Sequence, residues 1–279
     1  LTGYKTIART ITIAEGEDAI ENFSLSSFDT AVLGDWSGKV ASFLMDNGFA
    51  AESRDWSILE DLYNYNLVIV NTSSGTAEQI EKLMAESDKY ETSLVFVGSW
   101  GVANGSIPLL EQAIGYPQKD KHGYNQGAVY LDVAGDHPIF AGLEIAEPLR
   151  IHSEKSLYST FKNYKGIALA NIIVDGEDKG AAIAYDFRSA NHMHLLLSSF
   201  PVNNMMGPDA GWTEAGKQVY VQAMEWARTA QQQAPKAPVW DEDHVYAVDS
   251  AFSVSGQAGY RDIVDVYVDG VLTATVDTN

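Results

Sequence analysis

The stretch NLVIVNTSSGTAEQIEKLM, residues 66–84, decides the fold class of this chain. It opens with a near-continuous run of apolar, mostly β-branched residues, which is typical of a strand buried on both faces of a parallel sheet. Thr76 follows as a helix N-cap, with Gln79 three residues later as its reciprocal partner. Ile80 and Leu83 then begin the apolar face of a helix. A buried strand that leads into an amphipathic helix predicts an α/β fold.

The same alternation continues on both sides of this stretch. Strand-like runs and helical patterns follow one another between residues 29 and 230, and the last helix is predicted to begin near Thr213. The other predicted strands are 31–35, 93–99, 128–133, 166–174, 181–187 and 192–200. Because strand–helix–strand units cross over with one hand, the sequence predicts a doubly wound, mostly parallel sheet.

The composition limits the classes of partner. The chain has 279 residues, with 18 Lys and Arg against 38 Asp and Glu, and its net charge is −20. Such a surface repels nucleic-acid phosphates and anionic lipid headgroups, so we expect no nucleic-acid partner. No apolar run approaches the ~20 residues of a membrane helix, so we expect no membrane insertion. The chain has no cysteine, which excludes disulfides, thiolate nucleophiles and zinc–thiolate sites.

The chain divides into four parts at changes of pattern. Residues 1–28 hold β-rich runs around a turn, as in the last strands of a β-sandwich module, and the α/β pattern fills residues 29–230. Residues 231–244 combine glutamine, proline and acidic residues, as a linker does. Residues 245–279 alternate apolar and polar side chains around one turn, as in the first strands of a β-sandwich. We therefore expect β-rich segments at both ends of the α/β domain, in a chain cut from a larger protein.

In a doubly wound sheet, ligands bind beyond the carboxyl ends of the strands. The sequence places small, polar and aromatic residues there, and a histidine in a polar segment could face the same cleft. The candidate cleft residues are Asp35, Trp36, Asn71, Thr72, Ser99, Trp100, His152 and Ser199. Trp36 and Trp100 offer aromatic faces that could stack on a sugar or hold a peptide, although tryptophan is also a common core residue.

The tetrapeptide Gly-Ser-Trp-Gly around Ser99 approaches the strand-to-helix turn on which hydrolases mount a serine. That turn reads G-x-S-x-G. Centring it on Ser99 puts Val97 where the first glycine is needed, and centring it on Trp100 leaves no nucleophile. The sequence therefore favours a tight turn without catalysis. A hydrolase of sugar-derived or amide substrates that uses Ser99, or a cleft pair such as Asp35 and His152, is the alternative.

Two groups of residues are candidate metal ligands. His192 and His194 are two apart on a predicted strand, so their side chains share one face. No acidic residue lies within that strand to complete a ligand set, which favours ordinary sheet histidines. Asp241, Glu242 and Asp243 lack the spaced pattern of a calcium loop, which favours a solvated linker. No glycine-rich phosphate-binding motif is present, and we expect neither a metal nor a cofactor.

Several segments, taken together, resemble a known family. They are NLVIVNTSSG (66–75), LVFVGSWG (94–101), HPIFAGL (137–143), HMHLLLSSF (192–200) and MEWA (224–227). In this order they resemble the class I glutamine amidotransferase-like fold, and within it the ThuA-like (trehalose-utilisation) branch. The resemblance covers residues 30–230 and implies a flavodoxin-like α/β domain.

The departures from this family concern its chemistry. The catalytic cysteine of the amidotransferases would align near Ser99 or Trp100 and is absent, so glutaminase activity is not implied. The glycine–histidine pair that follows the late strand in ThuA-like proteins is replaced by Ser199, Phe200 and Pro201. The resemblance therefore implies a domain that has lost its nucleophile, and the sequence leans against an enzyme.

The two ends of the chain resemble other modules. Residues 4–25 resemble the end of a carboxypeptidase-regulatory-like module, and residues 251–276 resemble the opening of a bacterial immunoglobulin-like module. Strings of such modules are similar to those of large secreted or wall-associated Gram-positive proteins, including subtilisin-family peptidases. The resemblance implies a non-catalytic accessory, binding or spacer module, secreted or associated with the cell wall. Its expected partners are neighbouring domains of the same chain and a glycan or a peptide at the cleft.

Overall fold

The computed structural model describes the α/β region and four short strands near the C-terminus. The described residues are 28–35, 38–71, 74–97, 118–124, 128–145, 148–153, 157–161, 167–189, 191–197, 211–229, 239–240, 256–257, 263–268 and 271–277. The chain divides into two compact units, Leu1–Ala230 and Gln231–Asn279. Among the helices of the described segments, none is long and apolar enough to cross a membrane.

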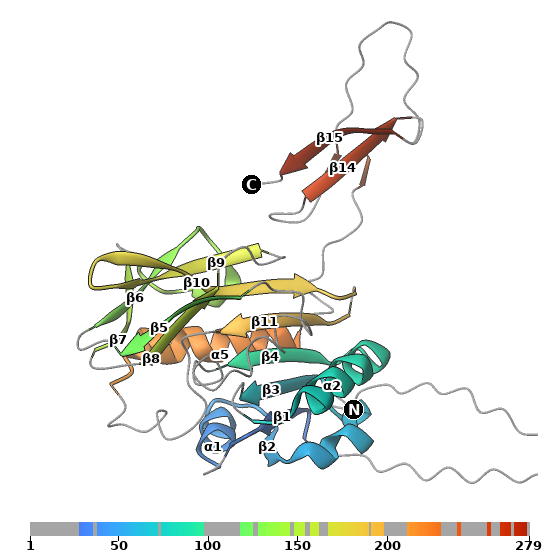
Figure 1. The fold of residues 1–279 in the computed structure, drawn as a ribbon, viewed down its shortest axis with the longest axis vertical. Helices are drawn as coiled ribbons and strands as arrows, with labels where there is room; N and C mark the ends of the chain where they lie inside the picture. Colours follow the sequence, from blue (N-terminus) through green and yellow to red (C-terminus); the bar gives the residue numbers. More distant parts are fainter. Residues whose placement is uncertain are drawn as a thin grey trace, which may run out of the picture. The chain divides into compact units, whose positions relative to one another are not determined.

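Five parallel strands form the core of the first unit (Figure 1). They are β1 (Thr30–Leu33), β2 (Ala51–Arg54), β3 (Leu67–Asn71), β4 (Ser93–Val97) and β11 (Met193–Leu197). Their spatial order is β2-β1-β3-β4-β11, and every neighbouring pair is parallel. Numbered along the chain, these strands have the order 2-1-3-4-5, which is that of the flavodoxin-like doubly wound fold. The predicted fold class is confirmed.

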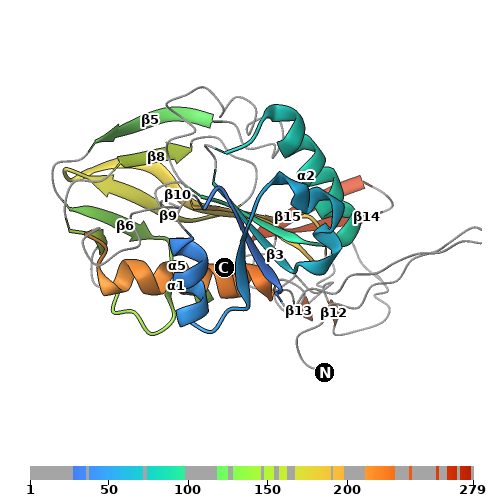
Figure 2. The same ribbon diagram turned by 90° about the horizontal axis from the view of Figure 1, so that it is seen from below.

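Helices cover both faces of the parallel sheet. Figure 2 shows α1 (Lys39–Asp46) and α5 (Glu214–Arg228) on one side of the sheet and α2 (Ala77–Tyr90) on the other. Two short 3-10 helices, η1 (Trp56–Glu60) and η2 (Leu62–Asn64), pack on the side of α2. In β3, Leu67 and Ile69 belong to the core with α1 and α5, whereas Val68 and Val70 belong to the core with α2. Because both faces are buried, the strand reads as a continuous apolar run.

Capping fixes both ends of α2. At its start, Thr76 N donates to Gln79 Oε1 at 2.9 Å and Gln79 N donates to Thr76 Oγ1 at 3.3 Å, so the predicted capping box is confirmed. At its end, Glu91 adopts a left-handed conformation with φ 52°, and β4 begins two residues later. The last turn of α2 therefore lies at the edge of the sheet where the parallel strands begin.

Beyond β11 the sheet is antiparallel. It continues through β10 (Glu177–Phe187), β9 (Ile167–Val174), β6 (Val129–Val133) and β7 (Leu149–His152), while β8 (Leu157–Phe161) pairs with β10 and β5 (Gln118–Tyr124) pairs with β8. Asp175 and Gly176 join β9 to β10 with φ angles of 53° and 76°, as a two-residue hairpin turn requires. The sheet is therefore mixed, with a parallel core and an antiparallel extension.

Two of the segments that carry the family resemblance meet in the core. His137 Nδ1 accepts a hydrogen bond from Ile139 N at 3.3 Å and so begins the 3-10 helix η3 (Pro138–Phe140). The ring of Trp226, from α5, lies 4.6 Å from that of His137 and 4.8 Å from that of Tyr185. This aromatic group fastens η3 and α5 to the antiparallel part of the sheet.

The second unit consists of paired strands. β12 (Val239–Trp240) pairs with β13 (Gly256–Gln257), and β14 (Ile263–Val268) pairs with β15 (Val271–Asp277), each antiparallel. The first 27 residues, and the parts of 231–262 outside β12 and β13, lie outside the described residues. The four-part division and the two flanking modules therefore stay predictions.

Candidate functional site

Two of the predicted cleft residues lie at the carboxyl edge of the parallel sheet, where its strands end. Asp35 follows β1 and Asn71 ends β3. Asn71 is buried, and its Nδ2 donates to the carbonyl oxygen of Gly34 at 3.2 Å. Gly34 has a φ of 77°, and a Cβ there would lie 2.8 Å from Asn71 Cβ, so this contact needs a glycine. The structure thus brings Asn71 and the Gly34–Asp35 segment together.

The carboxylate of Asp35 caps helix α1. The N-cap position is held by Gly38, which has no side chain to offer. Asp35 supplies the missing acceptors: Oδ2 accepts from Ala41 N at 2.9 Å and from Ser53 Oγ at 2.8 Å, and Oδ1 accepts from Val40 N at 3.3 Å. A negative charge at a helix N-terminus is also favoured by the helix dipole. Asp35 therefore has a structural function in holding α1 to β1 and β2.

Of the remaining predicted cleft residues, the structure describes only His152, which does not join this pair. Those that lie outside the described residues are Trp36, Thr72, Ser99, Trp100 and Ser199, so the predictions for them stay predictions. His152 ends β7, is 2% exposed, and lies with its ring 5.5 Å from that of Trp212. The strands β3, β4, β11, β10, β9 and β6 lie between β1 and β7. Asp35 and His152 therefore belong to different parts of the sheet.

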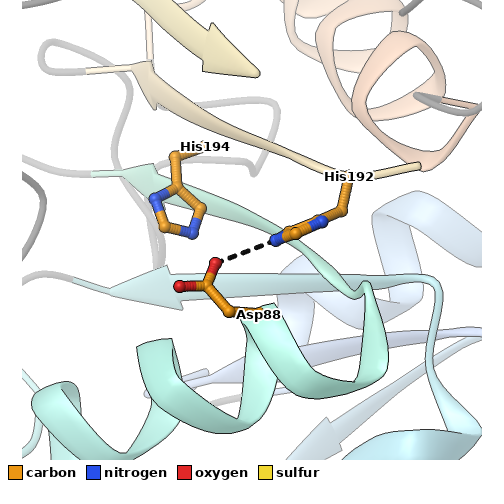
Figure 3. Close-up of side chains that lie close together, drawn as sticks. All are labelled: Asp88, His192 and His194. Carbon is orange, nitrogen blue, oxygen red and sulfur yellow. Dashed lines mark hydrogen bonds and ion pairs between the residues drawn. The ribbon is translucent and has the colours of Figure 1, made fainter. Parts of the chain in front are cut away.

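The opposite edge, where the parallel strands begin, holds three potential metal ligands (Figure 3). His192 immediately precedes β11, His194 is the second residue of β11, and Asp88 lies in the last turn of α2. Each offers one ligand atom, and these atoms lie within 4.8 Å of one another. We call these three residues the His–His–Asp cluster. Its two imidazoles and one carboxylate are a donor set suited to a divalent transition metal.

Hydrogen bonds hold two members of the cluster. His192 Nε2 lies 3.0 Å from Asp88 Oδ1, and His192 Nδ1 lies 2.9 Å from Ser189 Oγ. Arg188 contacts the same carboxylate, because its Nη2 donates to Asp88 Oδ2 at 3.2 Å. Partial burial acts to raise the pKa of Asp88, but the hydrogen bonds from Arg188 and His192 outweigh it, so this pKa lies below its usual value. Asp88 is therefore an anion at neutral pH.

His194 differs from the other two members. It is 0% exposed, and within the described part of the chain neither of its ring nitrogens has a hydrogen-bond partner. Its ring packs edge-on against Phe96 at 5.9 Å. Burial, with a smaller contribution from Arg188, lowers the pKa of His194 to about 3, so its imidazole is neutral. A buried polar group without a partner costs ~1–3 kcal/mol, which a ligand on that nitrogen would offset.

The sequence predicted part of this cluster. The prediction that His192 and His194 share one face is confirmed, because both rings approach Asp88. The expectation that no acid completes the set considered only the strand itself, and Asp88 comes from α2, 104 positions before His192. One signal for Asp88 was available, since an aspartate in the last turn of a helix is disfavoured by the helix dipole and calls for a nearby cation.

Comparisons with known proteins identify structural likeness only. No family model matches the chain, and no curated protein matches it. It is similar to a putative GMP synthase protein from Thermoplasma acidophilum, with TM-score 0.46 and 11% identity over 74% of this chain and 96% of that one. It is similar to a β-galactosidase from Rahnella sp. R3, with TM-score 0.45 and 14% identity over 72% of this chain and 31% of that one.

A third similar structure is α-L-fucosidase isoenzyme 2 from Paenibacillus thiaminolyticus, with TM-score 0.48 and 12% identity over 86% of this chain and 41% of that one. The chain thus spans less than half the length of either glycosidase. At these values the strand order 2-1-3-4-5, and not the likeness itself, carries the assignment of a flavodoxin-like fold.

Proposed function

We propose that this chain is part of a larger secreted or cell-wall-associated protein, in which its α/β unit is a non-catalytic accessory module. In this proposal the unit binds a glycan or a peptide at the carboxyl edge and contacts neighbouring domains of the same chain. The net charge of −20 disfavours anionic ligands, which leaves neutral glycans and neutral or basic peptides.

The observation that carries this proposal is that the carboxylate of Asp35 is already hydrogen-bonded within the fold. Its carboxylate accepts three hydrogen bonds, from Val40 N, Ala41 N and Ser53 Oγ. A carboxylate has about four acceptor positions, so little capacity is left for proton transfer to a substrate. The chain also has no cysteine, which rules out the nucleophile of the amidotransferases. Both facts support binding without turnover.

A binding screen and a turnover screen on the same protein test the proposal. The 279-residue chain would be applied to glycan and peptide arrays and assayed with chromogenic glycosides, esters and amides. We expect binding to one ligand class, no turnover, and at least about tenfold weaker binding in Trp100→Ala, because stacked aromatic rings dominate such contacts. Ser99→Ala is expected to bind as the wild type does.

Two results would overturn the proposal. Turnover that Ser99→Ala abolishes would establish the alternative, a hydrolase that uses this serine. An absence of binding on both arrays, together with an unchanged melting temperature in the presence of the array ligands, would leave a spacer without a ligand.

A further inference from the structure

We propose that the His–His–Asp cluster binds one divalent transition-metal ion of the zinc class through His192, His194 and Asp88. This site is separate from the binding proposed at the carboxyl edge, because it lies at the opposite edge of the sheet and shares no residue with it. The ion would join the last turn of α2 to the start of β11.

The spacing of the ligand atoms suits such an ion. A tetrahedral ion with bonds of about 2.1 Å keeps its ligand atoms about 3.4 Å apart. His192 Nε2 and Asp88 Oδ1 are already 3.0 Å apart, and all three ligand atoms lie within 4.8 Å. Atoms at that upper limit need to approach by about 1.4 Å, which rotation of the side chains supplies. Figure 3 shows His194 of β11 and His192, just before this strand, both projecting toward Asp88.

The buried ring of His194 points to a ligand. In the described part of the chain both of its nitrogens lack hydrogen-bond partners, although the residue is 0% exposed. Buried polar groups in folded proteins are nearly always hydrogen-bonded, so an imidazole that faces a second imidazole and a carboxylate needs an explanation. A metal ion satisfies the nitrogen lone pair of His194 and replaces the direct contact between His192 and Asp88.

The hydrogen bonds around His192 resemble those that orient a metal-binding histidine. A metal-binding imidazole donates its other N–H to a hydroxyl, carbonyl or carboxylate, which orients the ring. His192 Nδ1 lies 2.9 Å from Ser189 Oγ, and Ser189 Oγ donates to Glu91 Oε1 at 3.2 Å. Asn191 Nδ2 donates to Glu91 Oε2 at 2.5 Å and holds this carboxylate in place. These hydrogen bonds, from His192 through Ser189 to Glu91, use Nδ1 of His192 and leave Nε2, which lies 3.0 Å from Asp88 Oδ1, to face the ion.

The side chain of Arg188 must move away from Asp88 for the ion to bind. Its guanidinium contacts Asp88 Oδ2 at 3.2 Å and so occupies the cation-binding side of that carboxylate. A second carboxylate is close, since Arg188 Nη1 lies 3.8 Å from Asp186 Oδ2. The side chains of Arg188 and Asp88 are 36% and 44% exposed, so both can move. Arg188 can therefore pair with Asp186 while Asp88 turns to the ion.

The donor types select the class of ion. Mg²⁺ and Ca²⁺ prefer ligand sets made of oxygen alone, whereas imidazole nitrogen suits Zn²⁺, Co²⁺ and Ni²⁺. Three protein ligands leave a fourth position open, as in zinc sites that keep a water. The exposed side chain of Asp88 places that position toward solvent.

Metal titration of the whole chain tests the proposal. The 279-residue protein, with any affinity tag removed, would be stripped with a chelator and titrated with Zn²⁺ against a chromogenic chelator. Millimolar Mg²⁺ would be present to saturate the acidic surface. We expect one equivalent of Zn²⁺ to bind, Co²⁺ to show the visible absorption of a tetrahedral site, and the melting temperature to rise with Zn²⁺.

Variants separate this site from the rest of the acidic surface. Asp88→Asn, His192→Gln and His194→Leu should each weaken Zn²⁺ binding by more than about 100-fold, because even the partners of ligands are worth about 10–100-fold. Asp46→Asn, at the exposed last position of α1, is the matched control for Asp88→Asn and should bind Zn²⁺ as the wild type does. Folding of each variant would be checked by circular dichroism in chelator.

Three outcomes would overturn the proposal: stoichiometry well below one equivalent, displacement of Zn²⁺ by Mg²⁺, or unchanged Zn²⁺ affinity in folded His194→Leu and Asp88→Asn. None of them bears on binding at the carboxyl edge, so the two proposals can fail independently.

Discussion

Replacing Asp35 by alanine removes three hydrogen bonds from one carboxylate. Two of them are donated by Val40 N and Ala41 N in the first turn of α1, and the third is donated by Ser53 Oγ near the end of β2. Gly38, the N-cap residue, has no side chain that could take over. The first turn of α1 would therefore lose its cap, and the buried side chain of Val40 lies in that turn.

The size of the loss follows from these contacts. Removal of an N-cap side chain costs about 0.5–2 kcal/mol, and the Ser53 hydrogen bond contributes about 0.5–1.5 kcal/mol. We expect Asp35→Ala to lower the free energy of unfolding by about 2 kcal/mol in total. In a unit of this size that corresponds to a fall of about 4–8 °C in melting temperature.

The assay is urea and thermal unfolding of the whole chain, followed by circular dichroism. Asp35→Asn keeps one side-chain oxygen and should lose about half as much as Asp35→Ala. Ser53→Ala removes a single hydrogen bond and should cost about 0.5–1.5 kcal/mol. If Asp35→Ala unfolds within about 0.5 kcal/mol of the wild type, the capping argument is refuted. The carboxylate would then be available at the carboxyl edge, and the hydrolase alternative would regain support.

Three further substitutions test other parts of the fold. In chelator, His194→Leu should raise the free energy of unfolding at pH 7 by about 1 kcal/mol, because it removes a buried imidazole whose nitrogens have no partner in the described segments. The folded-state pKa of His194, about 3, is below the unfolded value, so the unfolded chain binds more protons between pH 3 and 6.5. Wild-type stability should therefore fall by roughly 1 kcal/mol per pH unit below pH 6.5, and urea unfolding of His194→Leu should show a flatter profile. Gly216→Ala should destabilise the chain by about 1–3 kcal/mol although alanine favours helices, because its Cβ would lie 2.4 Å from Ile151 O; a gain in melting temperature would contradict this close contact. Trp226→Ala should cost about 3–5 kcal/mol in urea unfolding, since it empties the aromatic group around His137 and Tyr185, and a loss below about 1 kcal/mol would refute that packing.

The fold could be predicted where its signals are local. The apolar run of β3 and the pair Thr76–Gln79 contain the information for one strand, one cap and one helix, and all three are confirmed. The direction of β9 and β10 relative to the core is not local, because apolar runs look the same in buried parallel and antiparallel strands. Asp175 and Gly176 are a local signal for an antiparallel hairpin of β9 and β10, but such a turn does not determine which strand β10 pairs with next.

The same distinction between local and non-local signals applies to the site residues. A period of two is enough to predict that His192 and His194 share a face, but their partner Asp88 reaches them only through the packing of α2 on β11. The function of Asp35 was also invisible in the sequence, because the position after a strand predicts a cleft residue and a helix cap equally well. What decides between them is the set of hydrogen bonds made in the fold, from Val40 N and Ala41 N of α1 and from Ser53 Oγ on a different strand.

The polar groups described at the two edges of the sheet differ in how well they are hydrogen-bonded, and this difference suggests where a ligand acts on the fold. At the carboxyl edge, Asp35 and Asn71 bond to the chain itself. At the amino edge, His194 is buried without hydrogen bonds in the described structure, although Leu195 to Leu197 show that leucine suits this strand. A leucine at position 194 would avoid a cost of ~1–3 kcal/mol. If His194→Leu is more stable than the wild type in chelator and also loses Zn²⁺ binding, the histidine serves the ligand and not the core. The stability that it removes from the metal-free fold would then be recovered, through linkage, by the bound ion.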